Sequence, residues 1–205
     1  MASPRASSML WDRSEISRTI VLLLVLVGVS RAMALDIDDI RITKQGRAYQ
    51  VQMTFGVTVS VNQVMAVLTD YGFPDRLDPE VTKREVISRQ GGITRVRTEI
   101  RGCAFIFCKD IAMTQDVTVA VDNIQAEIVP NESDFRSGYF RWSVSSSDNG
   151  GSYISFEAVM EPDFFIPPLI GGFFVRKMLR QKILAIAENL ESEAAREPAP
   201  IMNRI

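Results

Sequence analysis

Apolar and polar residues alternate along most of this chain of 205 residues. Residues 47–59 carry an apolar side chain at every second position, which predicts a strand with one buried face. From Val81 onward further alternating segments follow, separated by turn signals such as Gly91-Gly92 and residues 148–151. This pattern predicts a meander of antiparallel strands with one face in water. The predicted inward residues are Thr94, Val96, Thr98, Ile100, Ile111, Met113, Gln115, Val117, Ile124, Ala126, Ile128, Phe140, Trp142, Val144, Ile154, Phe156, Ala158 and Met160.

Helical signals lie on either side of these strands. Ser60 is a suitable cap for a short helix over residues 61–69, and residues 70–79 have the pattern of a second short helix. After Pro162 an apolar stretch leads into a long helix that ends near Ala195. The predicted apolar side of this helix consists of Phe174, Met178, Leu179, Ile183, Ile186, Ala187 and Leu190. The predicted polar side consists of Arg176, Lys177, Arg180, Lys182, Glu188 and Glu191.

The first 34 residues have the pattern of a signal peptide. Arginines precede an uncharged apolar run at residues 20–29, about half the length needed to span a bilayer. Ala32-Met33-Ala34 follows as a small-x-small cleavage pattern. We expect cleavage after Ala34, or after Ala32, and export to the periplasm. The alternative is a membrane anchor at residues 20–29 that leaves the rest of the chain facing the periplasm.

Cleavage after Ala34 leaves 171 residues, enough for one domain. We expect this domain at residues 35–197, followed by a flexible tail at 198–205, where Pro198 and Pro200 interrupt any helix. The cleaved chain holds 19 basic and 23 acidic residues, a net charge of −4. This balance argues against nucleic acid as a partner and against attachment to anionic lipid headgroups.

The chain contains no histidine. Serine–histidine and cysteine–histidine catalysis and histidine metal sites are therefore excluded. The only cysteines, Cys103 and Cys108, do not complete a tetrahedral set of metal ligands, so we expect no metal. We also expect no cofactor. In an exported protein this pair indicates a disulfide, which requires the chain to bend between them as the tip of a tight hairpin. The alternative is two buried free thiols.

Three segments of the chain are similar to a known superfamily. They are VNQVMAVLTDYGFPDRLDPEV (61–81), NESDFRSGYFRWSV (131–144) and PDFFIPPLIGGFFVRKMLRQKI (162–183). They resemble START-like (SRPBCC) proteins, in the branch of polyketide cyclase/dehydrase and coenzyme Q-binding proteins. The resemblance covers roughly residues 45–193. It implies an α+β helix-grip fold, in which a curved antiparallel β-sheet wraps around a long C-terminal helix.

A sheet bent around one helix leaves room for a cavity on its concave side. The predicted inward face is rich in aromatic residues and methionine, with few polar members. Together with the resemblance, this predicts a cavity for a lipid, quinone, sterol-like or polycyclic molecule. The alternative is that these residues simply fill the core. The ligand-binding candidates are Phe55, Tyr71, Val96, Thr98, Met113, Gln115, Phe140, Trp142, Phe156, Phe165, Phe174 and Met178.

We therefore expect an exported, non-catalytic protein that binds or transfers a hydrophobic ligand. The apolar approach to the last helix, which includes Phe165 and Phe174, is the segment expected to touch a membrane transiently during ligand exchange. The alternative function is a cyclase or lyase that acts on a polyketide-like substrate through Asp, Glu or Tyr side chains. The carrier is favoured because no carboxylate occupies a predicted inward position. For Asp70-Tyr71, a helix end with a packed ring explains the pair better than acid–base chemistry.

Overall fold

The computed structural model describes residues 36–72, 76–104, 107–166 and 171–196. All of them belong to one compact unit, Leu35–Ile205. The predicted signal peptide or anchor and the predicted tail lie outside the described residues. In the described part of the chain, no helix is long and apolar enough to cross a membrane.

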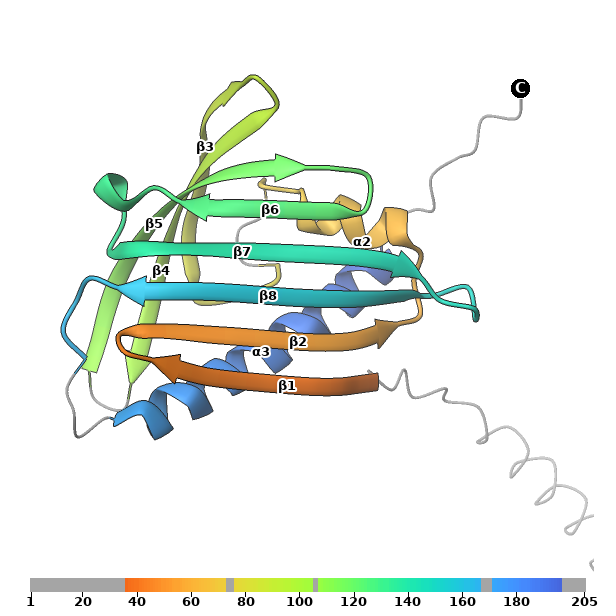
Figure 1. Ribbon diagram of the computed structural model, residues 1–205. Helices are drawn as coiled ribbons and strands as arrows, with labels where there is room; N and C mark the ends of the chain where they lie inside the picture. The colour runs from red at the N-terminus through yellow and green to blue at the C-terminus, as the bar shows by residue number, and fades with distance from the viewer. Residues whose placement is uncertain (1–35, 73–75, 105–106, 167–170, 197–205) are drawn as a thin grey trace, which may run out of the picture. The chain divides into compact units, whose positions relative to one another are not determined.

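Eight antiparallel strands form a single sheet in the order β1-β2-β8-β7-β6-β5-β4-β3 (Figure 1). The strands are β1 (Asp36–Gln45), β2 (Ala48–Val57), β3 (Val81–Gln90), β4 (Ile93–Ala104), β5 (Phe107–Val119), β6 (Asn123–Ile128), β7 (Phe135–Ser146) and β8 (Ser152–Pro162). From β3 to β8 each strand pairs with the next, as the meander prediction requires. Pairing of β8 with β2 joins the N-terminal hairpin to this meander, which leaves β1 and β3 as the two edges.

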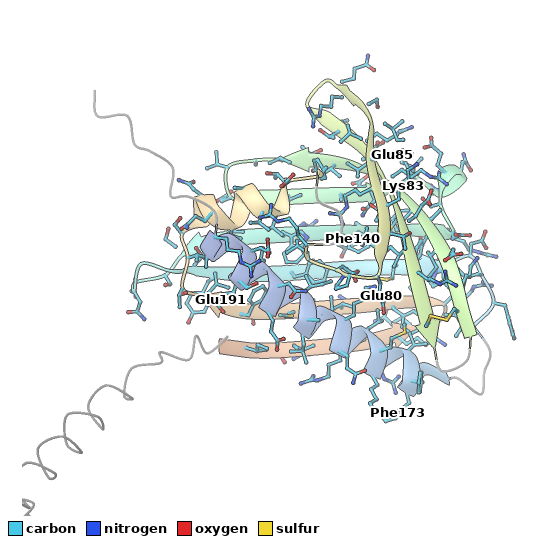
Figure 2. The ribbon with its side chains drawn as sticks, turned by 180° about the vertical axis from the view of Figure 1, so that it is seen from behind. Glu80, Lys83, Glu85, Phe140, Phe173 and Glu191 are labelled. Atoms are coloured by element: carbon cyan, nitrogen blue, oxygen red, sulfur yellow. A yellow bond between two sulfur atoms is a disulfide. The ribbon has the colours of Figure 1, made fainter. Side chains whose placement is uncertain are left out.

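Two α-helices and one short 3₁₀ turn complete the described elements. They are α2 (Val61–Leu68), η1 (Pro130–Glu132) and α3 (Gly171–Arg196). α3 lies across one face of the sheet, and β3 crosses in front of that same face (Figure 2). The predicted α+β helix-grip fold, with a curved antiparallel sheet around a long C-terminal helix, is confirmed.

The first strand of the sheet was missed by the sequence pattern. β1 pairs with β2 through a tight turn in which Gln45 lies opposite Ala48. Gly46 in this turn has φ +60°, which only glycine adopts without strain. A register shift between Ile37 and Asp39 interrupts the alternation of β1, and this explains why a strict period of two did not reveal it.

The predicted second short helix is wrong. In the described residues of this stretch, 70–72 and 76–79, the chain forms turns rather than helix. Asp70 accepts a hydrogen bond from the Gly72 amide at 2.9 Å, and Asp78 accepts one from the Glu80 amide at 3.1 Å. Such local side-chain bonds compete with helical hydrogen bonding and favour turns.

The main core lies between the sheet and α3. Alternate residues of β2 and β8, among them Val51, Phe55 and Ala158, are fully or almost fully buried. They pack with Ile183 and Leu190 of α3. The predicted apolar faces of these strands and of the middle of α3 are thereby confirmed.

Cys103 and Cys108 form a disulfide across the end of the β4–β5 hairpin. The two residues are directly paired in the register of β4 and β5. The predicted pairing and the predicted hairpin are therefore confirmed, and the alternative of free thiols is wrong.

Candidate functional site

A cavity of about 260 Å³ lies between the concave face of the sheet and α3. The sheet provides its floor, the middle of α3 covers it, and the end of α2 with the loop that follows forms one wall. β3, which follows this loop, contributes Val81 and Arg84 to the lining. The cavity is thus built by elements distant in sequence, which meet because the curved sheet wraps around α3.

An aromatic cluster forms part of the floor. Phe140 and Trp142 of β7 point to the same side as Phe156 of β8. The rings of Trp142 and Phe156 lie 4.3 Å apart between centroids, and those of Phe140 and Phe156 lie 6.4 Å apart. Figure 2 shows Phe140 on the face of the sheet that α3 covers. This surface suits the apolar body of a ligand.

The structure brings most of the predicted ligand-binding residues to this cavity. Its lining includes Tyr71, Val96, Thr98, Met113, Gln115, Phe140, Trp142 and Phe156. Contact of these eight residues with a ligand stays a prediction.

Four predicted residues do not line the cavity. Phe55 is 1% exposed and lies within the core between β1 and β8. Phe165 lies beyond the end of β8, where it is 78% exposed. Phe174 and Met178 belong to the first two turns of α3. This helix of 26 residues is about 39 Å long, so only its middle reaches the cavity.

The sequence analysis missed the charged residues of the lining: Asp78, Arg84 and Lys182. Arg84 faces inward because the register of β3 shifts between Val81 and Lys83, which places Arg84 opposite inward Thr98. Without that bulge, strict alternation from Val81 turns Arg84 outward. A bulge leaves no clear signal in the hydrophobic pattern, so the pairing of β3 with β4 was needed to find this residue.

Lys182 was predicted on the polar side of α3 but reaches the cavity. Its ammonium group lies 2.9 Å from the carboxylate of Asp78 and 2.6 Å from that of Glu80. Asp78 is 9% exposed. Its carboxylate has two partners, the Lys182 ammonium group and the Glu80 amide. These contacts tie α3 to the loop before β3 and neutralise the one carboxylate among the described lining residues.

The Tyr71 hydroxyl is buried and has no hydrogen-bond partner within the described residues. Burial raises the pKa of Tyr71 above its usual value, and the nearby Arg84 and Arg89 charges oppose this only in part. Burial also lowers the pKa of Arg84, against the opposing field of Asp78. Tyr71 therefore stays protonated at neutral pH, and its O–H group is a donor without an acceptor among the described residues.

Asp70, the neighbour of Tyr71, has a structural role. Its carboxylate lies 2.9 Å from Arg76, whose guanidinium also lies 2.7 Å from Glu193 of α3. The loop after α2 is thus fixed to α3 on both sides of Tyr71, and this geometry agrees with the predicted packing role of the pair.

The outer face of the sheet carries charge pairs. Arg141 of β7 lies 3.3 Å from Glu157 of β8, and both side chains are partly exposed. Across the described ranges, no cluster of acidic or cysteine side chains is arranged to hold a metal ion.

One family match covers most of the chain. Residues 48–195 match the family described as polyketide cyclase / dehydrase and lipid transport. No sequence among the curated proteins matches the chain significantly.

Solved structures share the fold at low sequence identity. The Zhui aromatase/cyclase from Streptomyces sp. R1128 has a TM-score of 0.60 at 15% identity, over 73% of this chain and 94% of its own. A START superfamily protein from Mycobacterium smegmatis has a TM-score of 0.57 at 16% identity, over 71% and 97% of the two chains. A protein from Thermus thermophilus has a TM-score of 0.56 at 18% identity, over 71% and 97%. The chain belongs to the polyketide cyclase/dehydrase and lipid transport family.

Proposed function

We propose that this protein is an exported, non-catalytic carrier that binds a hydrophobic molecule in the cavity between the sheet and α3. The observation that carries the proposal is the mainly apolar lining, which combines an aromatic floor with few polar groups. The family description, which includes lipid transport, supports the same function. Ligand pockets with this composition bind through burial of apolar surface and use the few polar groups for orientation.

Binding is favoured over catalysis by the state of the titratable groups. Asp78 is the one carboxylate among the described lining residues, and Lys182 holds it in an ion pair. A raised pKa makes Tyr71 a poor proton donor near neutral pH. An efficient general acid or base needs a pKa near the working pH, and Tyr71 does not provide one.

Trp142 provides a direct test of cavity binding. The only other tryptophan is Trp11, so the full-length Trp11→Phe variant reports fluorescence from the cavity floor alone. We expect 1-decanol, a neutral apolar probe, to shift the Trp142 emission in a saturable way. Native mass spectrometry of protein purified from its own compartment is expected to show a co-purifying hydrophobic molecule. An empty protein without any saturable response to decanol would overturn the carrier proposal.

A second candidate function is a cyclase that acts on a polyketide-like substrate. The observation in its favour is that Tyr71, whose hydroxyl has no partner among the described residues, lines the same cavity as Arg84. Turnover of a poly-β-keto thioester by the wild-type protein, lost in Tyr71→Phe but not in Tyr153→Phe on the exposed end of β8, would support this function. Decanol binding without turnover would support the carrier.

The proposed export and membrane contact rest on separate features. The Cys103–Cys108 disulfide is the kind of bond that persists in an oxidising compartment. Phe165, which precedes α3, is 78% exposed, and Phe173, in the first turn of α3, is 74% exposed. Arg176, Lys177 and Arg180 follow on the same helix, and no acidic residue occurs between residues 164 and 187. The net charge of −4 expected for the cleaved chain argues against headgroup attraction for the protein as a whole. This charge is not spread evenly, however, and the basic residues at this end of α3 suit an anionic lipid surface.

A further inference from the structure

The inward side of β3 carries two arginines, of which Arg84 lines the cavity and Arg89 is exposed. Arg84 lies opposite Thr98, and Arg89 lies opposite Thr94, in the register of β3 with β4. Thr94 and Thr98 belong to the concave face, so both arginines face that side. A second register shift, between Val86 and Ser88, is what turns Arg89 to the same side as Arg84.

Arg84 is half-buried yet makes no hydrogen bond or ion pair within the described part of the chain. The two carboxylates whose fields reach it are those of Asp78 and Asp70. Each already has a cation at 2.9 Å: Lys182 for Asp78 and Arg76 for Asp70. A guanidinium group in a desolvated position without a direct counter-ion is costly, so its presence in the lining calls for a partner from outside the chain.

Tyr71 presents a second donor in the same cavity. Its hydroxyl is buried without a partner, and an unsatisfied buried group of this kind is rare in folded proteins. The charge of Arg84 acts on Tyr71, which places the two groups within electrostatic range of each other. Thr98, which is 4% exposed, and Gln115 lie on the neighbouring strands β4 and β5 and add two uncharged polar groups to the lining.

We propose that the cavity binds an amphipathic carboxylate, with its anionic head held by Arg84 and Tyr71 and its apolar chain on the aromatic floor. This inference rests on the proposed binding function and specifies the ligand class. A carboxylate is acceptor-only, and it can accept two N–H bonds from a guanidinium fork together with the tyrosine O–H. A neutral apolar molecule leaves both donors unsatisfied.

The cavity volume of about 260 Å³ lies near the lower end of the range for ligand pockets, which starts at roughly 300 Å³. A carboxylate with a medium-length chain is therefore a suitable first probe.

The test compares decanoate with decanol, which share a chain length and differ in head-group charge. Dissociation constants are measured at pH 7.5 by calorimetry on the full chain, and Trp142 emission in the Trp11→Phe variant reports the location. We expect decanoate to bind at least tenfold more tightly than decanol. A charged hydrogen-bonded pair in a desolvated site gives discrimination of about tenfold to hundredfold.

Three variants separate the contributions of the two donors. Arg84→Gln is expected to weaken decanoate binding at least tenfold while decanol binding changes less than twofold. Tyr71→Phe is expected to weaken decanoate binding several-fold and to leave the fold intact, because it removes only an unsatisfied group. Arg101→Gln is the matched control, since Arg101 lies on the outer face of β4 and is 64% exposed.

The outcomes distinguish the ligand class from the binding function itself. Equal affinities for decanoate and decanol, unchanged by Arg84→Gln, would overturn the carboxylate proposal and leave the carrier proposal standing. Failure of both probes to bind would overturn both proposals. Equal weakening by Arg84→Gln and Arg101→Gln would assign the effect to general electrostatics and would also count against a specific site. If Arg84→Gln does not fold, Tyr71→Phe and Arg84→Lys give the same comparison.

Discussion

Glu191 is an ionisable side chain that the fold buries for a structural purpose. It is 5% exposed and accepts hydrogen bonds from the amide and the hydroxyl of Thr58, at 3.2 and 3.1 Å. Figure 2 shows Glu191 toward the end of α3, near α2. Nearby, Gln63 of α2 donates to the carbonyl of Ala194 at 3.3 Å. The final turns of α3 are thus fixed to the segment that joins β2 and α2.

We expect Glu191→Ala to lower the free energy of unfolding by about 1 to 3 kcal/mol, because it leaves the Thr58 amide without an acceptor. Urea denaturation followed by circular dichroism measures this change. Glu188→Ala, at an exposed position on the same helix, is the control and should change the free energy by less than about 0.5 kcal/mol. Equal effects of the two substitutions would show that the Thr58 contacts do not stabilise the fold.

Among the secondary-structure elements, the two ends of the sheet differ in what they expose. The β4–β5 hairpin ends in the disulfide, which closes a loop of six residues. Beyond β8, at the end of the sheet where Phe135 pairs with Pro162, exposed phenylalanines lead into α3. The β5–β6 turn lies at the opposite end, where Asn123 pairs with Ser143, and it exposes Val121.

Replacement of both Cys103 and Cys108 by Ser should lower the free energy of unfolding by about 2 kcal/mol and keep the fold. The physical reason is that the crosslink restricts the unfolded chain. Denaturant melts with and without reductant measure the difference, and the double variant should no longer respond to reductant. Full thiol labelling of the wild-type protein, denatured without reductant, would contradict the disulfide.

The proposed membrane contact predicts a phenotype for Phe165→Ser combined with Phe173→Ser. Because both side chains are largely exposed, we expect almost no change in Tm. Transfer of decanoate from the protein to vesicles that contain anionic lipid should become several-fold slower. The control is Val121→Ser with Tyr153→Ser, which removes exposed apolar groups elsewhere. Unchanged transfer per folded molecule in the Phe165/Phe173 variant would reject the contact.

For the molecule as a whole, the proposed oxidising compartment and the proposed carboxylate ligand are linked. A carrier that binds a carboxylate amphiphile beneath α3 needs a route for its ligand and a membrane to exchange with. The disulfide, the apolar run at residues 20–29 and the basic end of α3 are consistent with a protein that works beside a membrane in an oxidising compartment.

The export proposal predicts the N-terminus of the native protein. Sequencing of the protein isolated from the periplasmic fraction should begin at Leu35, or at Met33 if cleavage follows Ala32. A cytosolic marker enzyme, assayed in the same fractions, controls for leakage. Recovery of an intact Met1 terminus in the soluble cytosolic fraction would reject the proposal, and recovery of that terminus in the membrane fraction would support the anchor.

Elements with a locally regular pattern could be predicted from the amino-acid sequence alone. The strands after Val81, the end of α3 near Ala195 and the tip of the β4–β5 hairpin all follow from periodicity, turn residues and cysteine spacing. These features arise from neighbours within one strand or one helix, so the chain carries their full signal. Most of the apolar cavity lining followed in the same way, because it is the inward face of those strands.

The charged groups that reach the cavity became evident only from the packing of the folded chain. A register shift in β3 turns Arg84 inward, and the position of α3 across the sheet brings Lys182 to Asp78. The interrupted alternation of β1 hid an edge strand for the same reason. A bulge adds one residue to a strand and reverses the side on which all later residues lie, and its position is set by pairing with a partner strand. The hydrophobic pattern therefore reveals the apolar floor, whereas the polar groups proposed to select a ligand depend on contacts between segments far apart in the chain.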